Sequence, residues 1–222
     1  MSDTAKRAAA HAAAALVETG MHLGLGSGST IRFFIEALAA RIRDDGLAIT
    51  AIPSSDSTET RARAAGIPLA AHIAGIDFAV DGADEVEHGT QHLLKGGGGA
   101  LLREKIIAQS ARRLVIIADE TKQVACLGSR MALPVEVDPF AWELTAAHIA
   151  ILGGAPALRA GPRTDGHHLI LDCPGFGPIR DPYTLERRLH AIAGVIATGL
   201  FLMPVERVLI GLADGGVREI AR

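Results

Sequence analysis

The first 130 or so residues alternate short apolar runs with longer stretches of helical periodicity. Such alternation is typical of βαβ units, which build a parallel sheet covered by helices. We therefore predict the α/β class, with a Rossmann-like, mostly parallel sheet and helices on both faces. The predicted strands are 21–25, 48–52, 77–80 and 114–118, with an edge strand near 93–94, and the predicted helices are 3–19, 29–43, 54–65 and 100–111.

The pattern changes after residue 133 to strand, helix, two strands, helix and strand. This β-α-β-β-α-β order is the split βαβ, ferredoxin-like arrangement. The predicted elements are 134–137, 140–152, 157–159, 168–171, 183–192 and 195–202. We expect the closing segment 207–220, with strand and helix signals, to return to the first sheet. The prediction is a catalytic α/β domain of residues 1–130 and 206–222, and an inserted α+β domain of residues 131–205.

Bulk properties narrow the class of partner. The net charge is -3, no dense Lys/Arg stripe is present and only 4% of residues are aromatic, so a nucleic-acid partner is not expected. The longest uncharged stretch, 191–205, is shorter than the roughly 20 residues that cross a bilayer, so no membrane association is expected. The N-terminal segment lacks the pattern of a signal peptide, which predicts a cytoplasmic protein. Cys126 and Cys173 form no C-x-x-C pair and are expected to be reduced thiols.

Four polar loops follow predicted apolar runs: 24–30, 81–84, 95–99 and 119–122. In open parallel sheets, ligands bind at the carboxyl ends of the strands, so these loops are where chemistry is expected. The first loop combines glycines, hydroxyls and the start of a helix, which suits a phosphate. It lacks the third glycine of a dinucleotide fingerprint, because Ser29 stands there, and it lacks the lysine of a P-loop. A tight turn without a ligand is the alternative.

Asp81 and Asp84 flank Gly82-Ala83 directly after an apolar run. At least one carboxylate is expected to face the cleft, although Asp and Gly are also ordinary turn residues. A Mg²⁺ site is a further option, since carboxylates are hard oxygen ligands. Lys95 would compete with a cation by supplying the positive charge, so we predict no metal and no cofactor.

The glycine loop, Gly96–Gly99, follows Lys95 and precedes the predicted helix that carries Glu104. Each glycine makes ordering the chain more costly by up to ~1 kcal/mol relative to alanine. We therefore expect this run of glycines to have a function. Consecutive N–H groups there would form a nest for an oxyanion, with Lys95 adding a full charge. Glu104 would be available as a carboxylate base, or it is simply a solvated side chain on a helix surface.

The nine histidines give no spacing that favours a metal site, and we expect them to be solvent-exposed. A phosphate cradle, an oxyanion nest with a lysine and a carboxylate base together suit proton transfer beside a carbonyl on a phosphorylated sugar. Aldose-ketose isomerisation is that reaction, by the logic of triosephosphate isomerase. The rivals are a non-catalytic sugar-phosphate sensor, which would need neither Lys95 nor Glu104, and a nicotinamide dehydrogenase.

The four loops, together with Arg103-Glu104-Lys105, the segment 133–137 and Leu209-Ile210-Gly211, resemble the type A ribose-5-phosphate isomerase family over essentially the whole chain. The resemblance implies interconversion of D-ribose 5-phosphate and D-ribulose 5-phosphate through an enediolate in the non-oxidative pentose phosphate pathway. It also implies metal-free activity and a homodimer or homotetramer. The sequence departs from the family pattern at Ser27, Gly99 and Thr121, which preserve a hydroxyl or reduce bulk.

The resemblance also assigns roles to residues. Glu104 would be the proton-shuttling base, Lys95 and the glycine-loop amides would stabilise the enediolate, Asp81 would help to open the sugar ring and Asp84 would bind hydroxyls. The implied catalytic residues are Glu104, Asp81, Lys95 and Asp84. The implied substrate-binding residues are Ser27, Gly28, Ser29, Thr30, Asp81, Gly82, Ala83, Asp84, Lys95, Gly96, Gly97, Gly98 and Lys122, with Lys6 at the rim.

Overall fold

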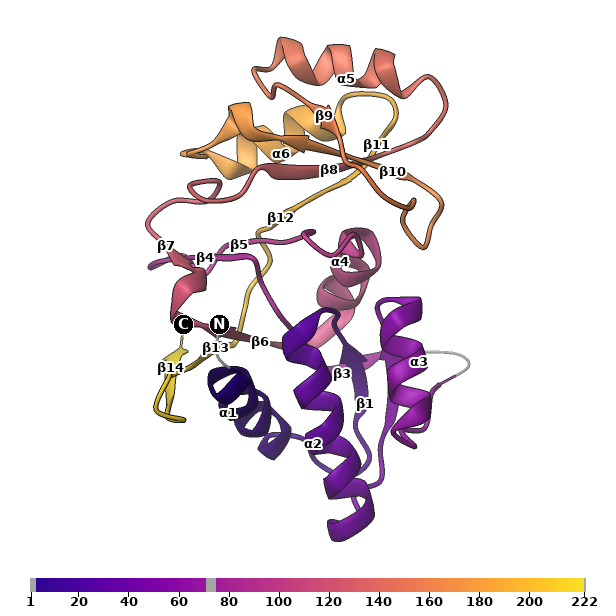
Figure 1. Ribbon diagram of the computed structural model, residues 1–222, viewed down its shortest axis with the longest axis vertical. Helices are drawn as coiled ribbons and strands as arrows, with labels where there is room; N and C mark the ends of the chain where they lie inside the picture. The colour runs from indigo at the N-terminus through magenta and orange to yellow at the C-terminus, as the bar shows by residue number, and fades with distance from the viewer. Residues whose placement is uncertain (1–2, 71–74, 222) are drawn as a thin grey trace. The chain divides into compact units, whose positions relative to one another are not determined.

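The computed structural model describes residues 3–70 and 75–221 and divides into two compact units (Figure 1). Unit 1 comprises Met1–Ala83, Arg103–Lys122 and Met203–Arg222, and unit 2 comprises Asp84–Leu102 and Gln123–Leu202. These bounds differ from the predicted domain ranges, since 84–102 and 123–130 group with unit 2. The physical reason is strand pairing, because the short strands in these segments pair with one another and with a strand at 200–201.

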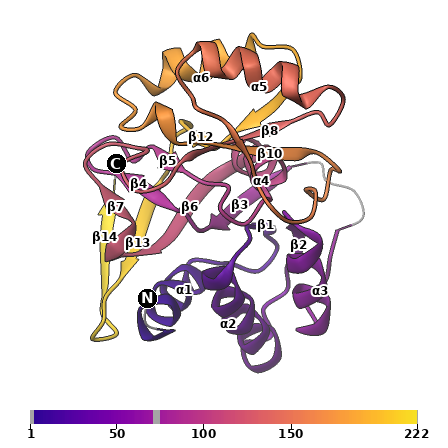
Figure 2. The ribbon, with the colours of Figure 1, turned by 45° about the horizontal axis from the view of Figure 1, so that its top comes forward.

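Unit 1 is built on a six-stranded sheet in the order β14-β13-β6-β3-β1-β2. Within this sheet β1, β2, β3, β6 and β13 run parallel to one another. Only β14 runs antiparallel, at the edge beside β13 (Figure 2). The strands are β1 (His22–Leu25), β2 (Thr50–Pro53), β3 (Ile76–Asp81), β6 (Ala111–Asp119), β13 (Arg207–Gly211) and β14 (Val217–Ala221). The prediction of a mostly parallel α/β sheet is confirmed.

Helices cover both faces of this sheet. Alternate strand residues such as Leu23 and Phe78 join the apolar core formed with α1 and α2, whereas Gly24 and Ala79 face Ile107 of α4. This is the alternation expected of strands buried on both sides. The helices are α1 (Asp3–Ala15), α2 (Ser29–Asp45), α3 (Asp56–Ala64) and α4 (Leu101–Ser110), which belongs to unit 1 from Arg103 onward. Figure 1 shows α1, α2 and α3 side by side.

Unit 2 contains a four-stranded antiparallel sheet in the order β11-β8-β10-β9. Its chain order is β8 (Leu133–Val137), α5 (Trp142–Ile151), β9 (Ala157–Leu158), β10 (Leu169–Cys173), α6 (Pro182–His190) and β11 (Val195–Thr198), with a 3-10 turn η2 (Pro174–Phe176). This is the split βαβ topology. A second small sheet has the order β12-β5-β4-β7, formed by β4 (Glu85–Glu87), β5 (Leu93–Leu94), β7 (Gln123–Val124) and β12 (Leu200–Phe201).

The predicted strand 195–202 is two strands, β11 and β12, which lie in different sheets. Gly199 separates them, and its N–H donates to the Pro134 carbonyl at 2.7 Å while its own carbonyl accepts from the Lys95 N–H at 2.9 Å. A Cβ at Gly199 would lie 2.4 Å from the Lys95 carbonyl oxygen. Only glycine allows three backbone segments to approach this closely.

One further local prediction was wrong. The closing helix signal within 207–220 is the strand β14, although the segment does return to the first sheet as predicted. The cap of α2 is Gly28, without a side-chain cap, whereas Ser29 and Thr30 lie inside the helix. The cap of α3 is Ser55, whose side chain accepts from the Thr58 N–H.

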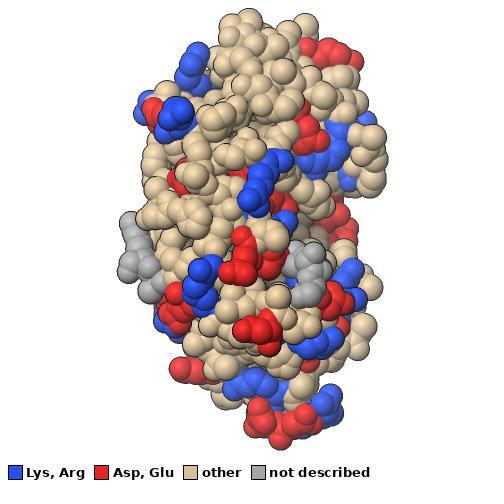
Figure 3. Space-filling view, turned by 60° about the vertical axis from the view of Figure 1, so that its left-hand side comes forward, with Lys and Arg blue, Asp and Glu red and all other residues tan. Residues whose placement is uncertain are grey.

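The surface and the thiols agree with the bulk properties. The face drawn in Figure 3 carries basic and acidic side chains interspersed rather than in one stretch of a single sign. None of the helices in residues 3–70 and 75–221 has both the length and the apolar character needed to cross a bilayer. Both cysteines are free, and burial raises the pKa of the Cys173 thiol to about 12, so it stays protonated at neutral pH.

Candidate active site

Three neighbouring parallel strands of unit 1 deliver the first, second and fourth predicted loops to one edge of the sheet. The order β6-β3-β1 places the ends of these strands side by side. The register pairs Leu25 with Val80 and Asp81 with Ile116, and the Gly26 N–H donates to the Val80 carbonyl at 2.9 Å. The edge is therefore the position at which ligands bind in parallel sheets.

Glu104 is held against the first loop. It lies in the first turn of α4, is 5% exposed, and its Oε1 accepts a hydrogen bond from the Ser27 hydroxyl at 2.5 Å. The alternative that Glu104 is a solvated side chain on the helix surface is therefore wrong. A buried carboxylate with one oxygen fixed by a hydroxyl is oriented as a general base requires.

Asp81 ends β3 and organises the turn around it. Its Oδ1 accepts from the Gly82 N–H at 2.7 Å and from the Ser27 N–H at 3.2 Å, and the residue is 4% exposed. Ser27 thus contacts both carboxylates, Asp81 through its amide and Glu104 through its hydroxyl. The sequence placed Ser27 and Asp81 in two of the candidate loops and Glu104 on the helix after a third, and the structure brings the three residues together.

Gly26 makes this assembly possible. A Cβ at position 26 would lie 2.0 Å from Asp81 Oδ1 and 2.7 Å from Asp81 Cα, closer than any real Cβ contact. We expect Gly26→Ala to displace Asp81, lower the free energy of unfolding by about 1–3 kcal/mol and remove most activity. Urea denaturation and steady-state kinetics measure the two effects. Gly75→Ala is the matched control, because a Cβ at Gly75 meets no atom within 4 Å, and an equal loss in both variants would contradict the argument.

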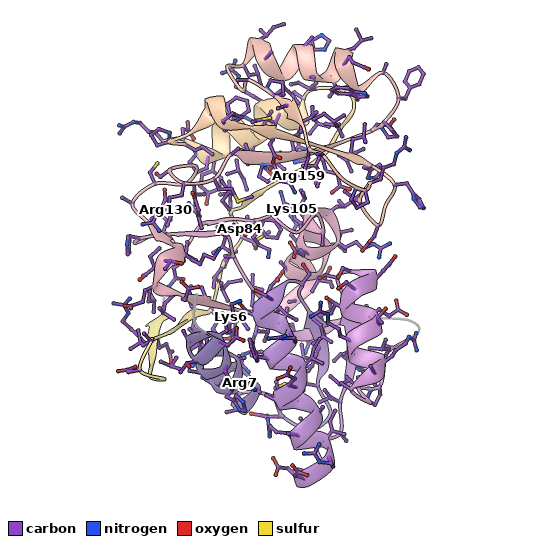
Figure 4. All side chains as sticks on the ribbon, in the orientation of Figure 1. Lys6, Arg7, Asp84, Lys105, Arg130 and Arg159 are labelled. Atoms are coloured by element: carbon purple, nitrogen blue, oxygen red, sulfur yellow. The ribbon has the colours of Figure 1, made fainter. Side chains whose placement is uncertain are left out.

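The start of α2 is suited to an anion. Its first turn follows Gly28, and the Lys6 ammonium donates to the Ser29 hydroxyl at 2.9 Å. Lys6 comes from α1 (Figure 4), whose backbone at Ala5 packs so closely on Gly211 that a Cβ there would lie 1.8 Å from the Ala5 carbonyl oxygen. A helix N-terminus with an adjacent ammonium favours phosphate.

Lys122 closes the short turn η1 (Glu120–Lys122) directly after β6. Asp119 shapes this turn, because its Oδ1 accepts from the Thr121 N–H at 2.8 Å and also from the Thr121 hydroxyl. Lys122 therefore lies at the same edge of the sheet as the first loop. The family resemblance implies that Lys122 holds the substrate, chiefly its phosphate, and that Lys6 contributes at the rim.

Unit 2 contains the rest of the predicted residues. Lys95 is 4% exposed, its ammonium lies 5.5 Å from the centroid of the Phe201 ring, and it directly precedes the glycine loop. Asp84 accepts the Gly97 N–H on Oδ2 at 2.8 Å, and the Gly99 N–H donates to the Gly96 carbonyl at 3.1 Å. Two amides of the predicted nest thus already have acceptors, and Asp84 binds the loop itself.

Sequence reasoning missed Arg159, which contacts the glycine loop, and Asp172, which contacts Arg159. Arg159 donates to the carbonyls of Gly96 and Gly97, and Asp172 holds the Arg159 guanidinium. Both residues are far from the loop in sequence and carry no motif. The only available signal was position, because Arg159 ends the predicted strand 157–159 and Asp172 directly follows the predicted strand 168–171.

The histidines were predicted to be exposed, and of the eight that the structure describes two are not, while His72 lies outside the described residues. His92 is half-buried with its Nε2 3.1 Å from the Tyr183 hydroxyl, and His168 Nδ1 lies 2.9 Å from the buried carboxylate of Glu136. Among the residues that the structure describes, no group of three His, Cys, Asp or Glu side chains could hold a metal ion.

Parallel strands followed by a buried Asp81, Lys122 and a helix N-terminus, with the Glu104 carboxylate held against the first loop, define an α/β enzyme of the class that binds a phosphorylated substrate at the strand ends. The model of the family described as Ribose 5-phosphate isomerase A (phosphoriboisomerase A) matches residues 50–215. This chain belongs to the ribose-5-phosphate isomerase A family.

Similar proteins agree with this assignment. The chain is 47% identical to ribose-5-phosphate isomerase A 1 of Oceanobacillus iheyensis, over 96% of each chain, and 48% identical to ribose-5-phosphate isomerase A of Gluconobacter oxydans, over 95% of this chain and 94% of that one. Among solved structures, ribose 5-phosphate isomerase A from Methanocaldococcus jannaschii matches with a TM-score of 0.92 and 38% identity, over 98% of both chains. A D-ribose-5-phosphate isomerase in complex with phospho-erythronic acid matches with a TM-score of 0.93 and 36% identity, again over 98% of both chains.

Proposed function

We propose that this chain interconverts D-ribose 5-phosphate and D-ribulose 5-phosphate through an enediolate. The observation that carries the proposal is the hydrogen bond from the Ser27 hydroxyl to Glu104, because it fixes a buried carboxylate beside the loop that leads into α2. Relatives named ribose-5-phosphate isomerase A support the substrate. The related structure in complex with phospho-erythronic acid, a phosphorylated acid, also supports it.

In the proposed mechanism Glu104 removes the proton from C2 of the open-chain aldose. The electron pair forms the C1–C2 double bond, and the carbonyl π electrons move to O1, which becomes the enediolate oxygen. Glu104 then returns its proton to C1, and the proton on O2 passes to O1, which leaves a carbonyl at C2. Atoms and charge balance, and no redox partner or metal is needed.

The remaining groups act on the same substrate. Lys95 and the glycine loop immediately precede α4, whose first turn carries Glu104, so a short stretch of chain links base and oxyanion stabiliser. The Lys95 ammonium and the loop amides lower the energy of the negative oxygen. Asp81 assists ring opening, as the resemblance implies, and Asp84 contributes through the loop that it binds and through substrate hydroxyls.

Phosphate binding falls to Ser27–Thr30, Lys6 and Lys122. We expect Lys122→Ala to raise KM for ribose 5-phosphate about 10-fold to 100-fold, in line with about 1.5–3 kcal/mol for a hydrogen bond to a charged group. The value of kcat should change little, since this contact is the same in substrate and transition state. Arg112→Ala is the control, because Arg112 is 82% exposed and pairs only at the surface with Asp77. A selective loss of kcat would contradict the phosphate role.

The isomerase proposal is tested by incubating the purified chain with ribose 5-phosphate in deuterated water. We expect ribulose 5-phosphate to form and, after many turnovers, deuterium to enter C1 of the ketose and C2 of the aldose, because a carboxylate base exchanges its proton with solvent. NMR locates the label. Ketose formation without label at either carbon would indicate a hydride shift instead, and absence of ketose would overturn the function.

The proposed chemistry uses no cofactor. The catalytic groups are carboxylates, an ammonium and backbone amides, so activity should persist after dialysis against a chelator. Activity that disappears with the chelator and returns with Mg²⁺ would overturn the metal-free mechanism.

A homodimer or homotetramer in the cytoplasm completes the proposal. Unit 2 exposes large apolar side chains in and beside α5, with Phe140, Leu144 and Ile151 exposed by 87%, 66% and 80%. Exposed apolar groups of this size favour a protein contact. Analytical ultracentrifugation gives the subunit number, and a monomer at micromolar concentration would contradict this part of the proposal.

A further inference from the structure

One peptide of the glycine loop is fixed from both ends by charged side chains. The Gly96 carbonyl accepts a hydrogen bond from Arg159 Nη1 at 2.6 Å, and the N–H of the same peptide, on Gly97, donates to Asp84 Oδ2 at 2.8 Å. In a trans peptide the carbonyl and the N–H point in opposite directions, so these two contacts define the peptide plane. Gly96 has a φ of 109°, which other residues avoid, so the loop needs glycine there and needs external contacts to hold it.

The next peptide has the same orientation relative to Arg159. The Gly97 carbonyl also accepts from Arg159 Nη1, at 3.3 Å. The N–H of that peptide belongs to Gly98, and it must therefore point away from the guanidinium. Gly98 is exposed, so its amide is available on the side opposite Arg159.

Arg159 is itself held in one orientation. Its Nε and Nη2 donate to the two carboxylate oxygens of Asp172 at 2.9 and 2.5 Å, and its backbone N–H donates to the Ile170 carbonyl at 2.9 Å. This paired contact leaves Nη1 for the loop carbonyls, a division of donors that the planar guanidinium allows and an ammonium does not. The two side chains are 23% and 31% exposed, so solvent only partly screens them.

We propose that Arg159, oriented by Asp172, is a positioning residue that presets the glycine loop for enediolate stabilisation, a role that rests on the proposed isomerase function. The guanidinium draws the Gly96 and Gly97 carbonyls to one side, which leaves the Gly98 N–H directed to the other. The positive charge of the guanidinium beside these two carbonyls also polarises the two peptide groups, which makes their N–H groups stronger donors. Arg159 does not touch the substrate in this arrangement; Asp84 and Arg159 come from separate segments of unit 2 (Figure 4).

The test compares Arg159→Gln, Arg159→Lys and Asp172→Asn with Arg163→Gln, a control at an exposed arginine near the same strands. We expect Arg159→Gln to lower kcat about 10-fold to 100-fold while KM for ribose 5-phosphate changes less than about threefold, because the loop acts on the transition state. Arg159→Lys should recover part of the loss, Asp172→Asn should lose less than Arg159→Gln, and the control should match the parent chain.

Two further readouts separate positioning from a merely structural contact. Affinity for phospho-erythronic acid, whose carboxylate places negative charge beside a hydroxyl-bearing carbon, should weaken in parallel with kcat, whereas inhibition by inorganic phosphate should not change. The double variant Arg159→Gln/Asp172→Asn should be no slower than Arg159→Gln alone, since the two residues act as one unit.

Three results would overturn the proposal while leaving the isomerase function intact: an unchanged kcat in folded Arg159→Gln, a rise in KM alone, or failure of all three variants to fold. An inactive parent chain with ribose 5-phosphate would instead overturn the function itself.

Discussion

Replacing Glu104 with Gln is expected to lower kcat for ribose 5-phosphate by at least about 10²-fold, the usual contribution of a positioned base. The amide oxygen of Gln can still accept the Ser27 hydroxyl, so the fold and the first loop should be retained. An amide cannot take up the C2 proton, so only the chemical step is lost. Steady-state kinetics and thermal unfolding measure the two properties separately.

The matched control is Glu143→Gln, an exposed glutamate in the first turn of α5. Its kcat should equal that of the parent chain. Solvent exchange adds a second check, because Glu104→Gln should also stop deuterium entry at C2 of the aldose. Turnover near the parent value in Glu104→Gln would remove Glu104 from the mechanism.

Lys95→Met should lower kcat by about 10²-fold to 10³-fold, comparable to losing one oxyanion-hole donor. Methionine replaces the apolar stem beside Phe201 but carries no charge, and the Lys95 backbone contacts do not depend on the side chain. The enediolate would then lose the ammonium group that stabilises it, whereas the groups proposed to bind the substrate phosphate would be unchanged. KM should therefore change far less than kcat.

Arg188→Met, at an exposed position of α6, is the comparison for loss of a positive charge in the same unit. A kcat of Lys95→Met close to that of Arg188→Met would contradict the role of Lys95. A large rise in KM with normal kcat would move Lys95 to ground-state binding.

The sequence predicted the larger elements because their signals are local. Apolar runs and helical periodicity sufficed for the parallel strands and for α1 to α6, and the helix that carries Glu104 begins within one residue of its predicted start. The strands β4 and β7 are three and two residues long, too short for a pattern to emerge. They owe their conformation to pairing with each other and with β5.

The helix signal near the end of the chain was misleading, because a tight turn directs this segment into the strand β14. Asp214, Gly215 and Gly216 reverse the chain, with the Gly216 N–H donating to Asp214 Oδ1 at 2.8 Å and the Leu212 N–H to the Gly216 carbonyl at 2.9 Å. Asp-Gly turns between apolar runs favour a hairpin. The turn signal should have outweighed the helical pattern of the last few residues.

For the candidate site, the sequence predicted the residue types and loops but not their contacts. That Ser27 would contact both Asp81 and Glu104 depends on strand register and helix packing, which no spacing encodes. The role of Arg159 required a hydrogen bond between residues 63 apart in the chain. Long-range contacts of this kind come only from coordinates.

The hydrogen bonds of Gly199 affect local unfolding of unit 2 around Lys95. Its amide and carbonyl join Pro134 of β8 to the amide of Lys95, so the main chain of Lys95 is linked to the antiparallel sheet through hydrogen bonds. Local unfolding that frees the Lys95 main chain must break its hydrogen bond to Gly199, which is itself bonded to Pro134 near the start of β8. The backbone of Lys95 is therefore held by a sheet of which it is not a strand. Slow hydrogen exchange of the Lys95 amide would be the measurable result.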